Sequence, residues 1–187
     1  MARVWFISDT HFYHGNIIRY CNRPWFSKRD EKGSPVILPQ DTDRMNADMI
    51  KNWNQTVGSD DVVWHLGDFA REETSLNMVR DVVTQLSGKI NLVMGNHDSM
   101  SIKKYLQCGF NRVYDYPVIF DDTFILSHEP IAQTDKLGGY TNIFGHVHNN
   151  GQYQTFTPNS VCVCVERHNY APISYEYIRA ELQKQHG

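Results

Sequence analysis

The chain has 187 residues, of which 41% are hydrophobic and 21% are charged, and its formal net charge is −3 at pH 7. These values are typical of a globular protein and exclude a disordered chain, and we expect one domain spanning residues 1–187. The slightly negative charge gives no general attraction to long-duplex nucleic acid or to an anionic membrane, so we expect neither as a partner.

The sequence carries few signals of transport or membrane insertion. Residues 4–7 form a short apolar run that is too brief for a signal peptide core, and no run approaches the roughly 20 apolar residues of a membrane helix. The four cysteines, Cys21, Cys108, Cys162 and Cys164, have the spacing of neither a disulfide framework nor a zinc knuckle. We therefore expect reduced thiols in a cytoplasmic protein.

In the first half of the chain, short apolar runs alternate with segments of helical periodicity. Apolar runs bounded by polar residues predict buried strands, and we expect these at residues 3–8, 62–66 and 89–94. Apolar residues at helical spacing predict a helix at 41–55, capped by Asp41 or Thr42, and another at 74–86 before Gly88. Between them and the first strand, residues 23–40 contain three prolines and no clear period, which predicts a long surface loop.

The second half of the chain is richer in predicted strands. Two runs flank Asp121 and Asp122 and predict a hairpin at residues 116–120 and 123–127. Further strands are expected at residues 142–144, 152–156 and 161–165, and a last helix should begin at Ser174. Strands that alternate with helices early and pair with each other later predict an α/β sandwich with mixed sheets.

Five of the predicted strands are followed at once by side chains that bind metals. These are Asp9 and His11, then Asp68, then Asn96, His97 and Asp98, then His128 and Glu129, and finally His146 and His148. Open α/β sheets place their ligand sites at the carboxyl ends of strands, and such side chains are the donors that divalent first-row metals take from proteins. The donors outnumber the needs of one ion, so we expect two ions, a pairing that typically serves hydrolysis of phosphate esters.

Glycine precedes three of these candidate ligands, at Gly67, Gly95 and Gly145. A residue without Cβ permits a sharp turn, and we expect each glycine to aim the side chain that follows it. His146 and His148 stand two positions apart, which places both imidazoles on one side of an extended segment. A lone histidine is more often structural, and a purely structural interpretation would have to explain all five clusters as coincidence.

Along the chain the candidates form D-x-H, G-D, G-N-H-D, S-H-x-P and G-H-x-H, from Asp9 to His148. This series resembles the signature of the calcineurin-like metallophosphoesterases, and the opening stretch SDTHFYHGNIIRYCNRPW resembles that of small bacterial and phage-encoded members. The resemblance implies an α/β fold, the calcineurin-like four-layer sandwich, in which two mixed β-sheets pack face to face and are flanked by helices. The metal site would lie in the loops at one edge.

The resemblance also implies a role for each residue of the signature. Asp9, His11 and His148 would hold one divalent ion, Asn96, His128 and His146 would hold a second, and Asp68 would bridge them. A hydroxide between the ions would attack phosphorus in line, while His97 would protonate the leaving oxygen and Asp98 would orient it. The metals of this family are manganese, iron, zinc or nickel, and we expect manganese.

For the reaction we expect hydrolysis of a phosphodiester or another small nucleotide-type phosphate ester. A phosphomonoesterase on the same site is the alternative, and an idle binding module is a third reading, although no ligand of the signature is missing. We expect His14, Asn16, Arg19 and Arg23 to contact the substrate. His14 and Asn16 could instead cap residues 15–20. Cations among aromatic residues could bind the phosphate and base of a nucleotide, although such a run is more often a solvated loop.

Overall fold

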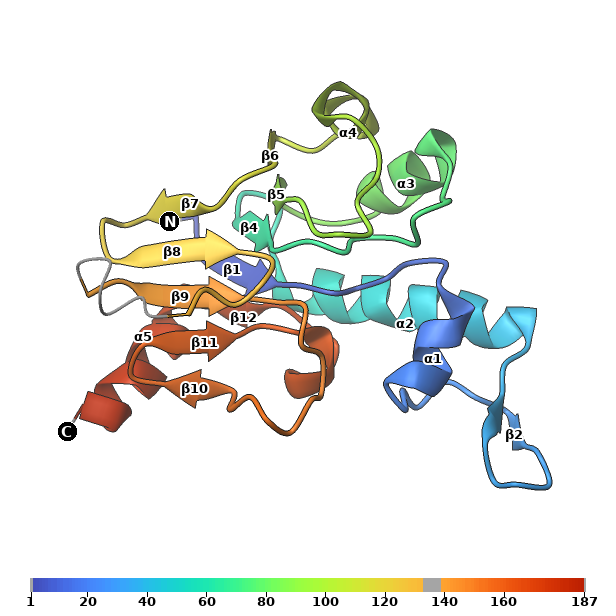
Figure 1. Ribbon diagram of the computed structural model, residues 1–187. Coiled ribbons are helices and arrows are strands. Elements are labelled where there is room, and N and C mark those ends of the chain that lie inside the picture. Colours follow the sequence, from blue (N-terminus) through green and yellow to red (C-terminus); the bar gives the residue numbers. More distant parts are fainter. Residues whose placement is uncertain (1, 133–138, 187) are drawn as a thin grey trace.

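The computed structural model describes residues 2–132 and 139–186 (Figure 1). The first of its two large sheets contains β1 (Val4–Ile7), β4 (Val62–His65), β5 (Lys89–Val93), β6 (Arg112–Tyr114) and β12 (Ile173–Ser174). The strand order is β12–β1–β4–β5–β6, and β1, β4, β5 and β6 run parallel while β12 is antiparallel to β1.

The second large sheet is also mixed. It contains β7 (Val118–Phe120), β8 (Phe124–Ser127), β9 (Thr141–Phe144), β10 (Phe156–Thr157) and β11 (Ser160–Cys162). Its order is β10–β11–β9–β8–β7, with β8, β9 and β11 parallel and an antiparallel strand at each edge. Two mixed sheets with helices confirm the expected calcineurin-like α/β fold.

The helices, apart from a 3₁₀ turn at Val165–Arg167, are α1 (Gly15–Tyr20), α2 (Pro39–Thr56), α3 (Leu76–Val83), α4 (Ile102–Cys108) and α5 (Tyr175–His186). A short hairpin of β2 (Lys28–Arg29) and β3 (Pro35–Val36) precedes α2. None of the described helices has the length and apolar character needed to cross a bilayer.

The two faces of the first sheet bury different cores. Along β1, Trp5 and Ile7 join a core with apolar residues of α1 to α4, whereas Phe6 faces the second sheet. Leu126 of β8 and Ile143 of β9 meet Phe6 in that second core. Alternation of side chains along a strand makes this arrangement possible, because each central strand carries apolar residues on both faces. The first sheet is therefore enclosed between helices and the second sheet.

The carboxyl ends of the parallel strands meet at one edge of the molecule. Ser8, directly after β1, forms an isolated parallel bridge with Cys164, which follows β11. In Figure 1 the arrows of β8, β9 and β11 point the same way, toward the loops that carry the candidate ligands. The expectation that polar residues after the strands converge is consistent with this topology.

Several boundaries differ from the sequence predictions. The helix expected at residues 41–55 begins two residues earlier, at Pro39, so Asp41 lies inside it and is not its cap. Instead, the Asp41 carboxylate accepts hydrogen bonds from the Leu38 backbone at 2.9 Å and the Ser27 hydroxyl at 2.5 Å. The loop expected at residues 23–40 contains the β2–β3 hairpin. The sequence patterns did not indicate α4, β6 or β12.

Candidate metal centre

The first two motif loops run side by side beyond the ends of β1 and β4. Backbone hydrogen bonds of 3.0 Å join the N–H of Asp9 to the carbonyl of Gly67 and the N–H of His11 to the carbonyl of Asp68. Residues 12 and 70 then pair as an isolated parallel bridge. The ladder of the sheet thus continues into the loops, which fixes Asp9, His11 and Asp68 relative to one another.

Five of the candidate ligands have left-handed backbone conformations. Their φ angles are 59° at Asp9, 49° at His11, 56° at Asp68, 69° at His146 and 49° at His148. This region is disfavoured for residues with a Cβ, and such strain concentrates at functional sites. The left-handed turns therefore occur at the ligands themselves.

One group of donors comes from the ends of both sheets. Asp9, His11 and His148 each offer a ligand atom, and the three atoms lie within 4.8 Å of one another. Asp9 and His11 are almost fully buried, and among the described residues neither Asp9 Oδ1 nor His11 Nε2 has a hydrogen-bond partner. A buried carboxylate oxygen and imidazole nitrogen without partners are costly unless a cation binds them, so this group fits a metal ion.

Asn96, His128 and His146 form the second group. The Asn96 Oδ1 atom lies 3.0 Å from His128 Nε2 and 3.1 Å from His146 Nδ1, and these two nitrogens are 3.1 Å apart. His128 Nδ1 lies 2.8 Å from the carbonyl of Leu66, which can only accept, so that nitrogen carries a proton and Nε2 is the atom that would bind an ion in this group. This group also fits a cation.

Asp68 lies between the two groups. Its Oδ2 atom is 3.4 Å from His11 Nε2 in the first group and 3.4 Å from His128 Nε2 in the second. Its Oδ1 atom accepts a hydrogen bond of 2.9 Å from the backbone of His97, which fixes the orientation of the carboxylate. One oxygen facing both groups is the arrangement expected of a bridging ligand.

Glu166 was missed by the sequence analysis, and it supports the first group. Its Oε1 atom lies 3.0 Å from His148 Nδ1 and accepts two hydrogen bonds from Arg23, at 2.9 Å from Nε and 2.6 Å from Nη2. Since a carboxylate accepts, His148 Nδ1 carries a proton and Nε2 points toward Asp9 Oδ1, 3.7 Å away. Glu166 directly follows the strand predicted at 161–165, so the rule that found the other ligands would have found it too.

Arg23 is placed neither to contact the substrate, as we expected, nor on a solvated loop, which was the alternative. Its side chain is 0% exposed. Besides Glu166, its guanidinium donates to the backbone carbonyls of Asp9 at 2.7 Å and Thr10 at 2.9 Å. The residue therefore holds the first motif loop in place, and the packing of distant segments around it could not be inferred from the charged run in which it stands.

His97 lies at the first group, whereas Asp98 has a different role from the one expected. The ring of His97 contacts those of His11 and His14, at centroid distances of 5.2 and 6.2 Å. The carboxylate of Asp98 is buried and accepts hydrogen bonds from the backbone N–H groups of residues 68, 69 and 95 and from the Tyr105 hydroxyl. Because these donors engage both oxygens, Asp98 fastens the motif loops and does not orient the His97 ring.

The other residues expected at the substrate lie beside His97. His14 Nδ1 is 3.3 Å from His11 Nδ1, and its side chain makes no helix-capping hydrogen bond. Asn16 is exposed and lines a hollow of about 300 Å³ together with His14 and Arg71, a residue that the sequence analysis did not select. Arg19 is exposed and stacks over Tyr20, whose ring contacts His14. These side chains surround one flank of the candidate centre.

The three motif glycines are needed for different reasons. Gly67 has φ of 89°, and a Cβ there would lie 2.5 Å from His128 Nδ1. At Gly145 a Cβ would lie 2.5 Å from Asp9 Oδ2, and at Gly95 it would overlap the Asp68 carboxylate, although neither residue has positive φ. The expected sharp turn thus applies to Gly67, whereas the other two glycines make room for the ligands.

The electrostatic environment of the two ligand groups favours the binding of a cation. Burial raises the pKa of Asp9 above its usual value. Burial disfavours charge on His128, but the hydrogen bond and charge of Asp68 and the charge of Asp9 outweigh it and raise its pKa to about 9. Burial is likewise outweighed at His148, where contacts with Cys21 and Glu166 raise the pKa to about 11. A divalent ion would take the place of these protons among the same carboxylates.

His65, Cys162 and Cys164 lie behind the candidate ligands. His65 is fully buried, with Nε2 3.0 Å from the Thr10 hydroxyl, so it supports the first motif loop. Cys162 and Cys164 are buried free thiols, and Cys164 Sγ donates to Asp9 Oδ2 at 3.3 Å. Neither Cys162 nor Cys164 belongs to a candidate metal group among the described residues.

A profile of the calcineurin-like phosphoesterases matches residues 2–174. The chain belongs to this family. The uncharacterized protein MJ1445 of Methanocaldococcus jannaschii is 35% identical to it over 189 residues, covering 98% of this chain and 93% of that protein. The Gene 66 protein of Mycobacterium phage L5 is 29% identical over 144 residues, covering 76% of this chain and 61% of that protein.

Among solved structures, the chain resembles the protein of unknown function AQ665 from Aquifex aeolicus. The TM-score is 0.68 at 27% identity, and the match covers 97% of this chain and 100% of that chain. None of these names states a substrate. Membership of the calcineurin-like phosphoesterases implies metal-dependent hydrolysis of phosphate esters, and the chain carries candidate ligand groups for it.

Proposed function

We propose that this calcineurin-like phosphoesterase uses two divalent ions to hydrolyse phosphodiesters or small nucleotide-type phosphate esters. The position of Asp68 carries the proposal, because one carboxylate oxygen lies 3.4 Å from a histidine of each ligand group. Manganese is the first ion to test, since the donors combine imidazoles with carboxylate and amide oxygens. When bound, the ions would activate a water molecule for in-line attack and neutralise charge on the phosphoryl oxygens.

The remaining chemistry belongs to the side chains. His97, beside His11 and His14, would give a proton to the leaving oxygen, as a positioned imidazole can do. Glu166 and the carbonyl of Leu66 hold one proton on the far nitrogens of His148 and His128, so that their Nε2 atoms face the centre. Hollows of about 370 and 300 Å³ on the two flanks support a small substrate.

The test compares hydrolysis of bis(p-nitrophenyl) phosphate and p-nitrophenyl phosphate by protein stripped of metal and then reloaded with Mn²⁺. We expect stripped protein to be inactive, and the His97→Ala variant to lose about 10²–10⁴-fold in kcat, the usual contribution of a general acid. Asp68→Asn should abolish activity, while Asp122→Asn, an exposed site on the β7–β8 turn, serves as the matched control. Hydrolysis that is indifferent to metal and to both variants would refute the proposal.

The same assay separates the diester activity from its alternative. A higher kcat/KM for the diester supports a phosphodiesterase, and a higher value for the monoester supports a phosphomonoesterase on the same centre. An idle binding module would hydrolyse neither substrate after reloading with Mn²⁺.

A further inference from the structure

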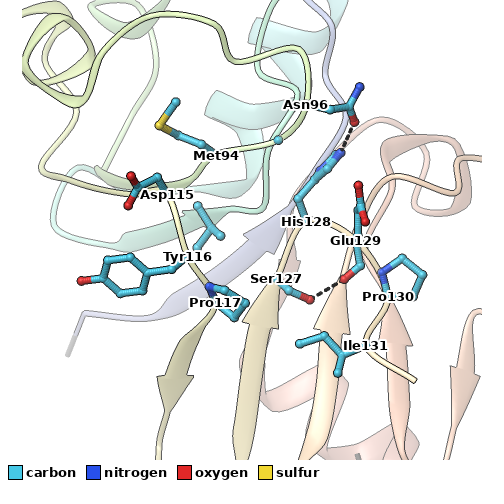
Figure 2. Close-up of a pocket in the computed structure, with 12 residues that line it drawn as sticks. Met94, Asn96, Asp115, Tyr116, Pro117, Ser127, His128, Glu129, Pro130 and Ile131 are labelled. Carbon is cyan, nitrogen blue, oxygen red and sulfur yellow. Dashed lines mark hydrogen bonds between the residues drawn. The ribbon is translucent and has the colours of Figure 1, made fainter. Parts of the chain in front are cut away.

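A hollow of about 370 Å³ opens beside the second ligand group (Figure 2). Three segments line it, residues 93–96, 115–117 and 127–131, which lie at the ends of β5, β6 and β8. We call this hollow the lateral pocket. Asn96 and His128 belong both to its lining and to the second ligand group, so a molecule bound through its phosphate at the centre could extend a substituent directly into the pocket.

The lining of the lateral pocket is mostly apolar. Met94, Pro117, Pro130 and Ile131 supply flat or flexible apolar surface, and none of the described residues that line the pocket is a lysine or an arginine. A volume of about 370 Å³ is at the small end of the range for ligand sites, roughly 300–1,000 Å³. The pocket therefore suits one compact organic group and cannot take a large partner.

Two carboxylates, those of Asp115 and Glu129, give the pocket its polarity. Both residues are exposed and stand on opposite sides of the pocket in Figure 2. Among the described residues, no hydrogen bond or ion pair engages either carboxylate. As ionised acceptors they would attract a group that donates N–H bonds and repel a second phosphate. The lateral pocket thus selects against polyphosphates. It also selects against a nucleic-acid strand that would place its next phosphate in the pocket.

A quaternary amine is the other group that carboxylates might attract, but the walls do not suit it. Recognition of such cations relies on several aromatic faces around the charge. Apart from the His128 imidazole, Tyr116 is the one aromatic residue among the described residues of the lining, and in Figure 2 its ring points away from the other lining side chains. Apolar walls with acceptors at the rim match a planar heterocycle with an amino group better than they match an ammonium ion.

We propose that the lateral pocket binds the nucleobase of a nucleoside phosphodiester, and that Asp115 and Glu129 select bases that carry an amino group. The base would lie between Met94, Pro117 and Ile131, and its amino group would donate to a carboxylate, as cytosine N4 donates to acidic residues in other complexes. This inference rests on the proposed function, because it assumes that the phosphate is held at the neighbouring centre.

The experiment compares three phosphodiesters that share p-nitrophenol as the leaving group. They are cytidine 5′-(p-nitrophenyl phosphate), uridine 5′-(p-nitrophenyl phosphate) and methyl p-nitrophenyl phosphate. Cytidine and uridine have nearly the same shape, and uridine has a carbonyl where cytidine has the amino group. We expect kcat/KM for the cytidine ester to exceed that of the uridine ester by about tenfold, the usual effect of one hydrogen bond to a charged acceptor. The double variant Asp115→Asn/Glu129→Gln should bring this ratio close to one, while the control Asp122→Asn should leave it unchanged.

The outcomes separate the pocket from the proposed function. Hydrolysis of the methyl ester with equal rates for cytidine and uridine would overturn the assignment of the pocket alone, and so would faster hydrolysis of a choline p-nitrophenyl phosphate than of the cytidine ester. If no ester is hydrolysed, the proposed function fails, and calorimetric binding of cytidine decides the pocket. Binding that Ile131→Trp abolishes by filling the pocket supports the proposal, and absence of binding to the wild type overturns it.

Discussion

The carboxylate of Glu166 joins two residues that are 143 and 18 positions away in sequence, Arg23 and His148. Its partners explain what could be predicted at the scale of single residues and what could not. The motif residues can be recognised in the sequence because each follows an apolar strand, and Glu166 follows one too. Arg23 gives no such signal, since its burial depends on loops brought together from distant parts of the chain.

Replacing Glu166 tests this network. In Glu166→Gln the neutral amide leaves the buried guanidinium of Arg23 without its counter-charge, which should cost about 3 kcal/mol, the lower end for a broken buried pair. The variant also loses the carboxylate acceptor of His148, so we expect Mn²⁺ affinity to fall by about 10–100-fold, as for other groups that orient metal ligands. Calorimetry with Mn²⁺ and urea unfolding of metal-free protein measure the two effects.

The matched control is Glu72→Gln, which makes the same chemical change at an exposed position. It should alter neither quantity. If Glu166→Gln binds Mn²⁺ as tightly as the wild type, Glu166 does not orient His148.

At the scale of elements, the sequence predicts strands better than short helices. Strands β1, β4 and β5 of the first sheet are apolar runs flanked by polar residues, and each appears within one or two residues of the expected bounds. Helix α4 has seven residues, of which only Tyr105 and Cys108 are buried, so it lacks enough apolar positions to show a helical period. The left-handed turns at the ligands also escape a pattern search, because they are imposed by the loops packed around them.

Asp61 ties the beginnings of three parallel strands together, and its charge should make this junction sensitive to acid. Its carboxylate accepts hydrogen bonds from the backbone of Arg3 at 2.8 Å, the backbone of Gly58 at 3.0 Å and the indole of Trp5 at 2.8 Å, and its carbonyl accepts one from Lys89 at 2.8 Å. The backbone bond from Arg3, with those from Gly58 and Trp5, lowers its pKa from 3.8 to about 2.

A carboxyl group with a lower pKa in the folded state takes up its proton more readily when the chain unfolds, so acid favours unfolding. The contribution of Asp61 is therefore fully present above its ordinary pKa of 3.8 and is lost as the pH falls toward about 2. Asp61→Asn should cost roughly 1–3 kcal/mol at neutral pH, because its amide group faces N–H donors. The difference in unfolding free energy between wild type and variant should shrink across that acid window.

Urea unfolding in the presence of a chelator, at neutral pH and through the acid range, measures this difference without a contribution from bound metal. Asp60→Asn changes the exposed neighbouring carboxylate and is the control. A difference that stays constant with pH would show that the Asp61 charge does not stabilise the junction.

At the scale of the whole molecule, the candidate centre draws on both sheets. Asp9, Asp68 and Asn96 follow strands of the first sheet, whereas His128 and His146 follow strands of the second. The convergence of these ends could be anticipated from the order of the motifs and the resemblance they carry. The division of the interior into two cores could not, because each central strand is apolar on both faces and the sequence does not say which face meets helices.

Since the ligands join the two sheets, bound metal should stabilise the entire fold. An ion at 100 times its dissociation constant adds about 2.7 kcal/mol, and for a domain of this size each kcal/mol raises Tm by roughly 2–4 °C. We expect Mn²⁺ to raise Tm relative to chelator by about 5–10 °C for each ion bound.

His128→Ala and His148→Ala remove a candidate ligand from different groups, so each should retain part of the shift and the double variant none of it. His97→Ala, which keeps all seven candidate ligands, should retain the full shift. A complete loss in either single variant would mean that the two groups hold one ion or bind two only together, and an unchanged shift in the double variant would place the metal elsewhere.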